Sequence, residues 1–229
     1  MNKTIIIPCF NEKKTILTLL ERVKKNLING DEIIIVDDFS SDGTRDLLKT
    51  INENFIKIKY HDKNYGKGRA LKTALNQELK DIVIIQDADL EYNPDEYKIL
   101  MQPFLDTNAD IVYGSRFLGS QKYTRLHFFW HSVANKILTL ICNLLTNLNM
   151  TDMETGYKAF KKNVIKSIDI QEKSFGVEPE ITIKLAKKKF IFFEVPISYA
   201  GRSYSEGKKI GIKDAFRAIY CILLYGFRF

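Results

Sequence analysis

The feature that most limits the possible folds is a short apolar run that leads directly into three evenly spaced acids. Residues 82–85 read Ile-Val-Ile-Ile, and Asp87, Asp89 and Glu91 follow at intervals of two. Consecutive apolar, mostly β-branched residues predict a strand buried on both faces, as in the middle of a parallel sheet. Because ligands bind at the carboxyl ends of strands in open α/β sheets, the acids mark a candidate site.

The same acids predict a bound cation. Three carboxylates this close in sequence repel one another unless a positive charge neutralises them. Mg²⁺ and Mn²⁺ are hard divalent ions that prefer oxygen ligands, so either would suit Asp87, Asp89 and Glu91. On spacing alone, a solvent-exposed acidic turn is the alternative, and Glu91 is also placed to cap the helix near Pro94.

Strands and helices alternate through the first half of the chain. Apolar runs predict strands at residues 4–8, 32–36, 56–60, 82–85 and 111–114, with helical spacing at 14–29, 44–52, 69–79 and after Pro94. This alternation predicts an α/β fold with a mainly parallel, doubly wound sheet. Pro8 is expected to end the first strand because proline lacks a ladder donor, and the polar strand at 56–60 is expected near an edge.

The second half has a different character. Helices are predicted at residues 123–149, 164–168, 175–188 and 212–229, a strand at 190–196, and a polar loop at 200–211. Residues 1–120 are slightly acidic, so the excess behind the net charge of +7 lies in residues 121–229. We expect one domain over residues 1–229, with an anionic partner such as phosphate or a membrane surface facing residues 121–229. A lysine-rich composition without functional meaning is the alternative.

Several classes of protein are disfavoured. Cys9, Cys142 and Cys221 lack metal-ligand spacing and are expected to be reduced thiols. No apolar stretch reaches the roughly 18–20 residues of a transmembrane helix, and no signal peptide is visible, so we expect a cytoplasmic protein peripheral to the inner face of the membrane. Nucleic-acid binding is disfavoured because basic residues alternate with Leu and Phe instead of forming a stripe.

Acids at other strand ends extend the candidate site. Glu12 follows the first predicted strand, and Asp37 and Asp38 follow the second. Because such loops converge on one edge of a doubly wound sheet, these acids are expected beside Asp87 and Asp89, where a carboxylate can bind a ribose hydroxyl or a base N–H. Helix capping is the alternative for Asp37 and Asp38.

The order of short motifs resembles the family-two inverting glycosyltransferases, in the branch of the dolichyl-phosphate mannose synthases and related polyprenyl-phosphate hexosyltransferases. Almost the whole chain takes part in the resemblance. The motifs are PCFNE (8–12), VDDFSSDGT (36–44), NYGKG (64–68), DADLE (87–91), GSRF (114–117), TDMETGYK (151–158), FGVEPE (175–180), EVPI (194–197) and RSYSEGKK (202–209).

This resemblance implies a GT-A fold, a nucleotide-sugar donor and a set of site residues. The implied metal ligands are Asp87, Asp89 and Glu91, holding Mg²⁺ or Mn²⁺. The implied donor-binding residues are Pro8, Phe10, Glu12, Asp37, Asp38, Lys67, Asp87 and Lys208. The implied acceptor-binding residues are Arg116, Arg125, Ser132 and Arg202, and the implied catalytic residues are Asp89, Arg116, Arg202 and Glu178.

The implied reaction moves a hexose, glucose or mannose, from a UDP- or GDP-sugar to undecaprenyl or dolichyl phosphate at the cytosolic membrane face. Such an acceptor is already ionised, so it needs cationic groups more than a base. A hydroxyl of a lipid-linked or cell-surface glycan is the alternative acceptor; it would need a carboxylate base, for which Glu178 or Glu180, then Asp152, are candidates. A non-enzymatic membrane-associated adaptor on the same fold is the alternative from another class.

Two apolar segments predict contact with a lipid surface. Residues 125–131 (RLHFFWH) and the final helix combine aromatic side chains with basic flanks, as interfacial helices do. Packing on the sheet or in a homodimer is the alternative, and a membrane-protein partner is a further way to reach a lipid substrate.

Overall fold

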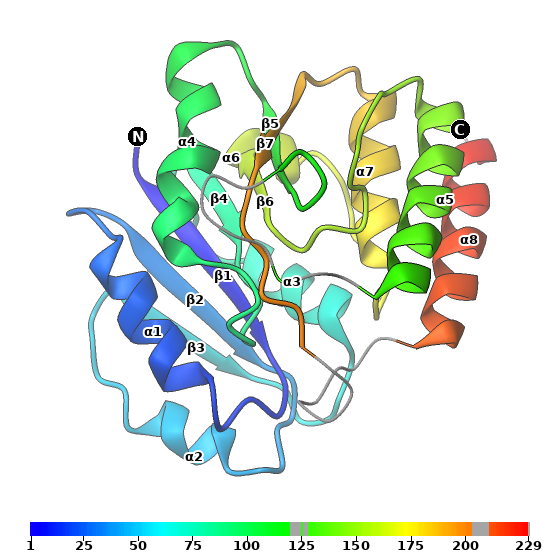
Figure 1. Ribbon diagram of the computed structural model, residues 1–229. Coiled ribbons are helices and arrows are strands. Elements are labelled where there is room, and N and C mark those ends of the chain that lie inside the picture. The colour runs from blue at the N-terminus through cyan, green and yellow to red at the C-terminus, as the bar shows by residue number, and fades with distance from the viewer. Residues whose placement is uncertain (120–124, 126–127, 203–210, 229) are drawn as a thin grey trace.

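The computed structural model describes residues 1–119, 125, 128–202 and 211–228, and these residues form a seven-stranded sheet with helices on both faces (Figure 1). The strands are β1 (Lys3–Cys9), β2 (Glu32–Asp37), β3 (Ile56–Tyr60), β4 (Ile82–Ile85), β5 (Ile111–Ser115), β6 (Lys158–Lys161) and β7 (Phe192–Pro196). Their order across the sheet is β3-β2-β1-β4-β6-β5-β7. The apolar run at 82–85 is therefore the central strand, and β3 is an edge strand, as the sequence predicts.

The central strands bury both faces because nearly all of their residues are apolar. Ile5 and Ile7 of β1 face one core, while Ile6 faces the other, and β2 and β4 alternate in the same way. Helices α1 (Ile16–Lys25), α2 (Thr44–Lys49) and α4 (Tyr97–Asp106), which follows a 3₁₀ turn, η1 (Pro94–Glu96), cover the first face. Helices α3 (Lys67–Leu75), α6 (Lys162–Ile165) and α7 (Val177–Lys187) cover the second.

Helices α5 (Phe129–Thr146) and α8 (Ile212–Phe227) complete the second face and lie side by side against α7 (Figure 1). Leu138 and Cys142 of α5 and Cys221 and Ile222 of α8 enter the core. None of the helices in the described part of the chain has the length and hydropathy needed to span a bilayer.

Strand β6 is the main departure from the predicted topology. It runs antiparallel between β4 and β5, while the other neighbours pair in parallel. The sequence reading misses it because Lys-Ala-Phe-Lys is short and lacks an apolar run; buried Lys158 is held instead by an ion pair with Glu178. Through β6, the second half of the chain joins the sheet built by the first half.

Pro8 does not end β1, contrary to the sequence expectation. The strand continues to Cys9, and Pro8 lies opposite Val36 in the register with β2. The Ile6 carbonyl accepts from Gln86 N on the β4 side, so the main chain of Pro8, two residues on, also faces β4. Pairing with β4 stops at Ile6, so no ladder donor is needed at Pro8.

Candidate active site

A cavity of about 370 Å³ lies at the carboxyl edge of the parallel strands. The loops after β1, β2, β4, β5 and β7 contribute to its wall, together with the loop before antiparallel β6 and the start of α7. Most of the site residues predicted from the sequence line it, namely Pro8, Phe10, Glu12, Asp38, Lys67, Asp87, Asp89, Glu91, Arg116, Glu178 and Arg202.

Three loops of this edge contain a non-glycine residue in the left-handed region. Asn11 (φ 52°) follows β1, Phe39 (φ 66°) follows β2, and Leu90 (φ 65°) separates Asp89 from Glu91. Such a conformation costs on the order of 1 kcal/mol and is concentrated at functional sites. In the DADLE motif, this turn lets Asp89 accept a hydrogen bond from Glu91 N at 3.1 Å.

Asp38 shapes the glycine loop that precedes α3. Its carboxylate accepts from Tyr65 N at 2.9 Å and Gly66 N at 2.7 Å, and His61 Nδ1 lies 2.6 Å away. Gly66 has φ 91°, and a Cβ there would lie 2.3 Å from the Lys173 carbonyl oxygen, so the loop requires glycine. The loop thereby delivers Lys67, the first residue of α3, to the cavity.

Asp37, also predicted to bind the donor, is fully buried and is not among the residues that line the cavity. Its Oδ2 lies 2.7 Å from Arg45 Nε, and Arg45 Nη2 donates to the His61 carbonyl at 2.6 Å. In this structure Asp37 therefore ties the end of β2 to α2.

The acids after β4 are each paired with a cation from elsewhere in the chain. Asp87 lies 2.7 Å from Lys67 Nζ, and Asp89 lies 3.0 Å from Arg202 Nη2. Burial and the charges of Glu91 and Asp87 raise the pKa of Asp89 to about 7, although Arg202 opposes that shift. The three carboxylates thus sit close enough to repel one another, as the sequence predicts.

This group suits a hard divalent cation by charge and by donor type, since it offers carboxylate oxygens crowded at one edge. Asp87, Asp89 and Glu91 would be the residues to hold it. In the described part of the chain, no three His, Cys, Asp or Glu side chains converge as a preformed metal site. The carboxylates are directed instead at Lys67 and Arg202.

Arg202 connects three acids from two loops. Its Nη1 and Nη2 each lie 3.2 Å from an oxygen of Glu12, its Nη2 contacts Asp89, and its main-chain N donates to Glu91 Oε1 at 2.9 Å. Tyr199 donates its hydroxyl to Glu91 Oε2 at 2.5 Å. Asn93 caps the turn at Pro94–Glu96, so Glu91 is a site residue and not the cap.

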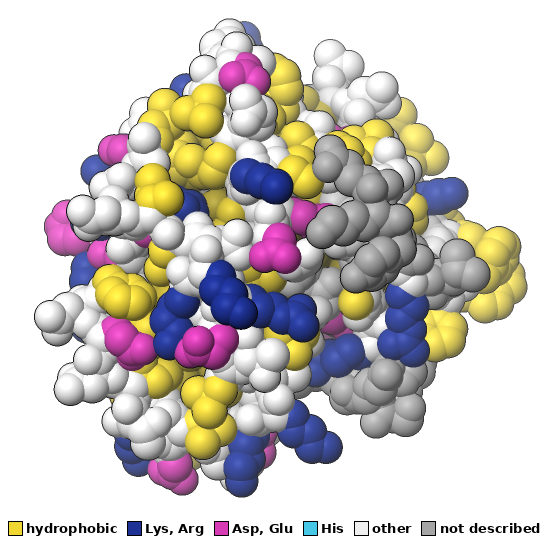
Figure 2. Space-filling view, turned by 60° about the vertical axis from the view of Figure 1, so that its left-hand side comes forward, with side chains coloured by type: hydrophobic (Ala, Val, Ile, Leu, Met, Phe, Trp, Pro, Cys, Tyr) yellow, Lys and Arg dark blue, Asp and Glu magenta, His cyan; other side chains and the backbone are white. Residues whose placement is uncertain are grey.

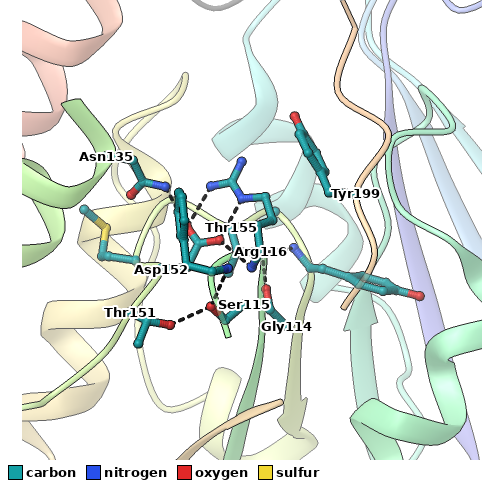
Figure 3. Close-up of polar contacts among 12 residues, drawn as sticks. Gly114, Ser115, Arg116, Asn135, Thr151, Asp152, Thr155 and Tyr199 are labelled. Atoms are coloured by element: carbon teal, nitrogen blue, oxygen red, sulfur yellow. Dashed lines mark hydrogen bonds and ion pairs between the residues drawn. The ribbon is translucent and has the colours of Figure 1, made fainter. Parts of the chain in front are cut away.

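Arg116 lies in the cavity wall and is held there by Asp152 (Figure 3). Its Nε and Nη2 donate to the two oxygens of Asp152 at 2.7 Å, and Asn135 also donates to Asp152 at 2.8 Å. The guanidinium lies 5.1 Å from the Tyr199 ring centre. Asp152 engages two of its five N–H groups, so others remain for a ligand such as an anion.

Glu178, predicted as a catalytic residue, lies between two lysines. Lys67 Nζ is 3.0 Å from Oε1, and Lys158 donates to Oε2. Burial raises the pKa of Glu178, but the two lysines outweigh burial and leave that pKa below its ordinary value. A carboxylate stabilised in this way is a weak proton acceptor.

The structure adds site residues that sequence reasoning missed. Tyr92, Tyr199 and Glu154 line the cavity, as do Asn64, Gly156, Ser174 and Phe175. Tyr92 accepts from Gly156 N at 2.9 Å, which joins the loop after β4 to the loop before β6. Glu154 lies inside the TDMETGYK motif, which was the signal available for it.

Besides Asp37, two predicted residues of the described part of the chain, Arg125 and Ser132, are not among those that line the cavity. Arg125 is exposed, and its main-chain N donates to the Tyr199 carbonyl at 3.1 Å. Ser132, in the first turn of α5, places its hydroxyl 3.4 Å from the Phe128 carbonyl. Lys208 lies outside the described residues. Their assignment to acceptor or donor remains a prediction.

The fold and the acid-bearing edge define a GT-A glycosyltransferase. A solved structure of glucosyl-3-phosphoglycerate synthase from Mycobacterium tuberculosis, in complex with Mn²⁺, UDP and phosphoglyceric acid, superposes on 98% of this chain and 78% of its own with a TM-score of 0.75, at 19% identity. This likeness establishes the shared fold. The chain belongs to glycosyl transferase family 2, whose family model matches residues 4–169.

Curated relatives extend the family match over nearly the whole chain. A UDP-N-acetylglucosamine–dolichyl-phosphate N-acetylglucosaminyltransferase from Methanococcus voltae is 30% identical over 96% of this chain and 94% of its own. An undecaprenyl-phosphate mannosyltransferase from Micrococcus luteus is 27% identical over 92% and 88%, respectively. A dolichol-phosphate mannosyltransferase from Pyrococcus furiosus is 26% identical over 97% of this chain and 64% of its own.

Proposed function

We propose that this enzyme transfers a hexose, with inversion, from a UDP- or GDP-sugar to a polyprenyl phosphate at the cytosolic face of a membrane. Relatives named for transfer to dolichyl or undecaprenyl phosphate support the acceptor class. Glucose, mannose and N-acetylglucosamine remain to be compared as the sugar, since those relatives are named for different sugars.

The ion pairs of Glu178 are the observation that favours a phosphate acceptor over a hydroxyl acceptor. A hydroxyl acceptor needs a base to remove its proton, whereas a phosphate is already ionised at neutral pH. Glu178 is neutralised by Lys67 and Lys158, and its pKa is lowered. An anionic acceptor agrees with this arrangement, because it requires cations to hold it more than a base.

In the proposed reaction, an oxygen of the acceptor phosphate attacks the anomeric carbon. The bond from that carbon to the donor diphosphate breaks, and the nucleoside diphosphate leaves with the electron pair. Negative charge therefore builds up on the leaving diphosphate, where positive groups stabilise it. Arg202 and Lys67 are cavity cations beside the acids after β4. Arg116 also lines the cavity, and its role in the proposed reaction is to bind the acceptor phosphate. A bound Mg²⁺ or Mn²⁺ would add Lewis-acid stabilisation of the diphosphate.

The exposed faces of α5 and α8 support attachment to a lipid surface. Trp130, Leu144 and Phe227 are about three-quarters exposed (74%, 75% and 74%), and Phe129 and Phe216 are each 69% exposed. These side chains lie on two adjacent helices. Large apolar groups exposed together are typical of a membrane or protein contact, and a peripheral position would bring the enzyme to a lipid-borne acceptor.

Transfer from radiolabelled donors to purified undecaprenyl phosphate tests the function. UDP-glucose, UDP-N-acetylglucosamine and GDP-mannose are compared, each with Mn²⁺, with Mg²⁺ and with a chelator. We expect one donor to label the lipid, and the chelator to abolish labelling. Equal labelling of undecaprenol, which lacks the phosphate, would refute a phosphate acceptor.

A further inference from the structure

Glu154 is a carboxyl group of the cavity wall that has no role in the reaction described above. It lies in the loop before β6, and its Oε1 is buried with no hydrogen-bond partner among the described residues. Buried carboxyl oxygens in proteins are nearly always paired. An unpaired one in the wall of a donor cavity therefore points to a group on the ligand.

The neighbouring cations are already engaged by other groups. Lys158 Nζ donates to the Met153 carbonyl at 2.9 Å and also to the Thr155 carbonyl and Glu178 Oε2, which accounts for all three of its N–H groups. Arg116 is bound in two-point fashion by Asp152. Neither cation hydrogen-bonds the buried Oε1 of Glu154, although Arg116 keeps N–H groups that Asp152 does not use.

Glu154 is therefore a carboxyl group without a cation bound to its buried oxygen. The ionisable groups that face it are Glu178 of α7, Lys158 of β6, Arg116 after β5, Asp152 of its own loop and Cys142 of α5. Burial and the charge of Glu178 raise the pKa of Glu154 to about 7, with Lys158 and Arg116 opposing them. A carboxyl group that is protonated part of the time at neutral pH can both donate and accept hydrogen bonds, which suits a hydroxyl or an amide.

The sheet order indicates which part of the donor lies near Glu154. The donor-site residues after β2 and β1 come first, then the acids after β4, and then the loop before β6. That loop packs closely on the acids, since a Cβ at Gly156 would lie 2.2 Å from Asp87 Oδ2. A donor with its nucleoside near β1 and its diphosphate near β4 places its sugar toward β6.

We propose that Glu154 hydrogen-bonds a hydroxyl or acetamido group of the transferred sugar and thereby contributes to the choice of sugar. The inference rests on the proposed function, because it assumes a nucleotide-sugar donor in this cavity. It assigns to the TDMETGYK loop a task separate from metal and acceptor binding.

Binding is measured by calorimetry without acceptor, in the presence of Mn²⁺. UDP, UDP-glucose, UDP-N-acetylglucosamine, GDP and GDP-mannose are titrated into wild type, Glu154→Ala, Glu154→Gln and the exposed control Glu78→Gln. In Glu154→Ala we expect the affinity for the preferred sugar nucleotide to fall about tenfold, as for one lost hydrogen bond, while the matching nucleoside diphosphate binds unchanged. Glu154→Gln preserves the side-chain volume and should change the order of affinity for the sugar nucleotides. It provides the test if the alanine variant unfolds.

Unchanged affinity and ranking of the sugar nucleotides in both variants would overturn the inference. A hundredfold loss of kcat in Glu154→Gln, with sugar binding intact, would also overturn it and would identify Glu154 as a general base. If wild type discriminates among sugars through Glu154 but labels no polyprenyl phosphate, the proposed acceptor fails while the inference about Glu154 stands.

Discussion

At the residue scale, the acids of the candidate site are already neutralised by the chain's own cations. Arg202 alone contacts Glu12, Asp89 and Glu91, and Lys67 contacts Asp87 and Glu178. A divalent ion that enters this edge competes with a guanidinium for the same oxygens.

Replacing Arg202 with Ala should strengthen metal binding in the absence of donor while weakening transfer. The substitution removes the competing cation, and we expect roughly a fivefold to tenfold tighter Mn²⁺ dissociation constant, about 1 kcal/mol. Free Mn²⁺ is followed by electron paramagnetic resonance during titration, with the exposed Arg22→Ala as control. Weaker Mn²⁺ binding in Arg202→Ala would show that Arg202 organises the acids instead of competing for them.

Glu154 should make the folded protein less stable as pH rises. Its pKa is about 7 in the folded protein against an ordinary value of 4.5, so the folded state holds its proton longer. The contribution of Glu154 to the free energy of unfolding therefore decreases as the pH rises from 4.5 to 7, and it stays at the lower value above pH 7. Glu154→Gln should thus be more stable than wild type at pH 8 by on the order of 2 kcal/mol, and equal to it near pH 4.

Urea unfolding at pH 4 and pH 8 measures this difference, with Glu78→Gln as the matched change at an exposed position. A stability difference that is the same at both pH values would mean that folding does not shift the pKa of Glu154, and would contradict the charge balance described for its surroundings.

At the scale of elements, α5 and α8 each have a buried side and an exposed apolar side. Leu138 and Cys142 of α5 enter the core, whereas Leu144 is 75% exposed. On α8, Cys221 and Ile222 are buried, whereas Phe227 is 74% exposed. The packing on the sheet that the sequence left as an alternative is therefore real, but it accounts for one side of each helix only.

The double substitution Leu144→Ser and Phe227→Ser should reduce cosedimentation with vesicles of phosphatidylglycerol and phosphatidylcholine at least fivefold, with little effect on stability because both side chains are exposed. Leu105→Ser, at a 59% exposed position of α4, is the control on the opposite face of the sheet. Unchanged vesicle binding, with a dimer converted to monomer in light scattering, would assign the surface to self-association.

Elements with strong apolar runs could be predicted from sequence, and those that depend on tertiary contacts could not. The strand at 82–85 can be predicted because its four residues are all apolar. Strand β6 cannot, because its buried Lys158 depends on the ion pair with Glu178. The same holds in the site: acids at strand ends are visible as a pattern, while Tyr199 reaches Glu91 only through folding.

At the scale of the whole molecule, opposite charges are distributed unevenly. The net charge is +7, and on the face shown in Figure 2 basic side chains gather near the centre with acidic side chains beside them. A basic protein is attracted to anionic lipid, and salt screens that attraction.

Vesicle binding should therefore weaken as ionic strength rises from about 0.05 M to 0.5 M, over which the Debye length falls roughly threefold. Cosedimentation with anionic and with neutral vesicles measures the effect, and we expect it for the anionic ones only. Salt-independent binding to both would assign the attachment entirely to the apolar faces of α5 and α8.

The antiparallel strand β6 also has a consequence for how the chain is assembled. On a ribosome, β1 to β4 emerge in order and can pair with one another. The edge of β4 that faces away from β1 stays unpaired until residues 158–161 have been made. Until then, four apolar residues present an open strand edge, which favours pairing with other chains. Chains that stop before β6 should accordingly aggregate more readily than chains that include it.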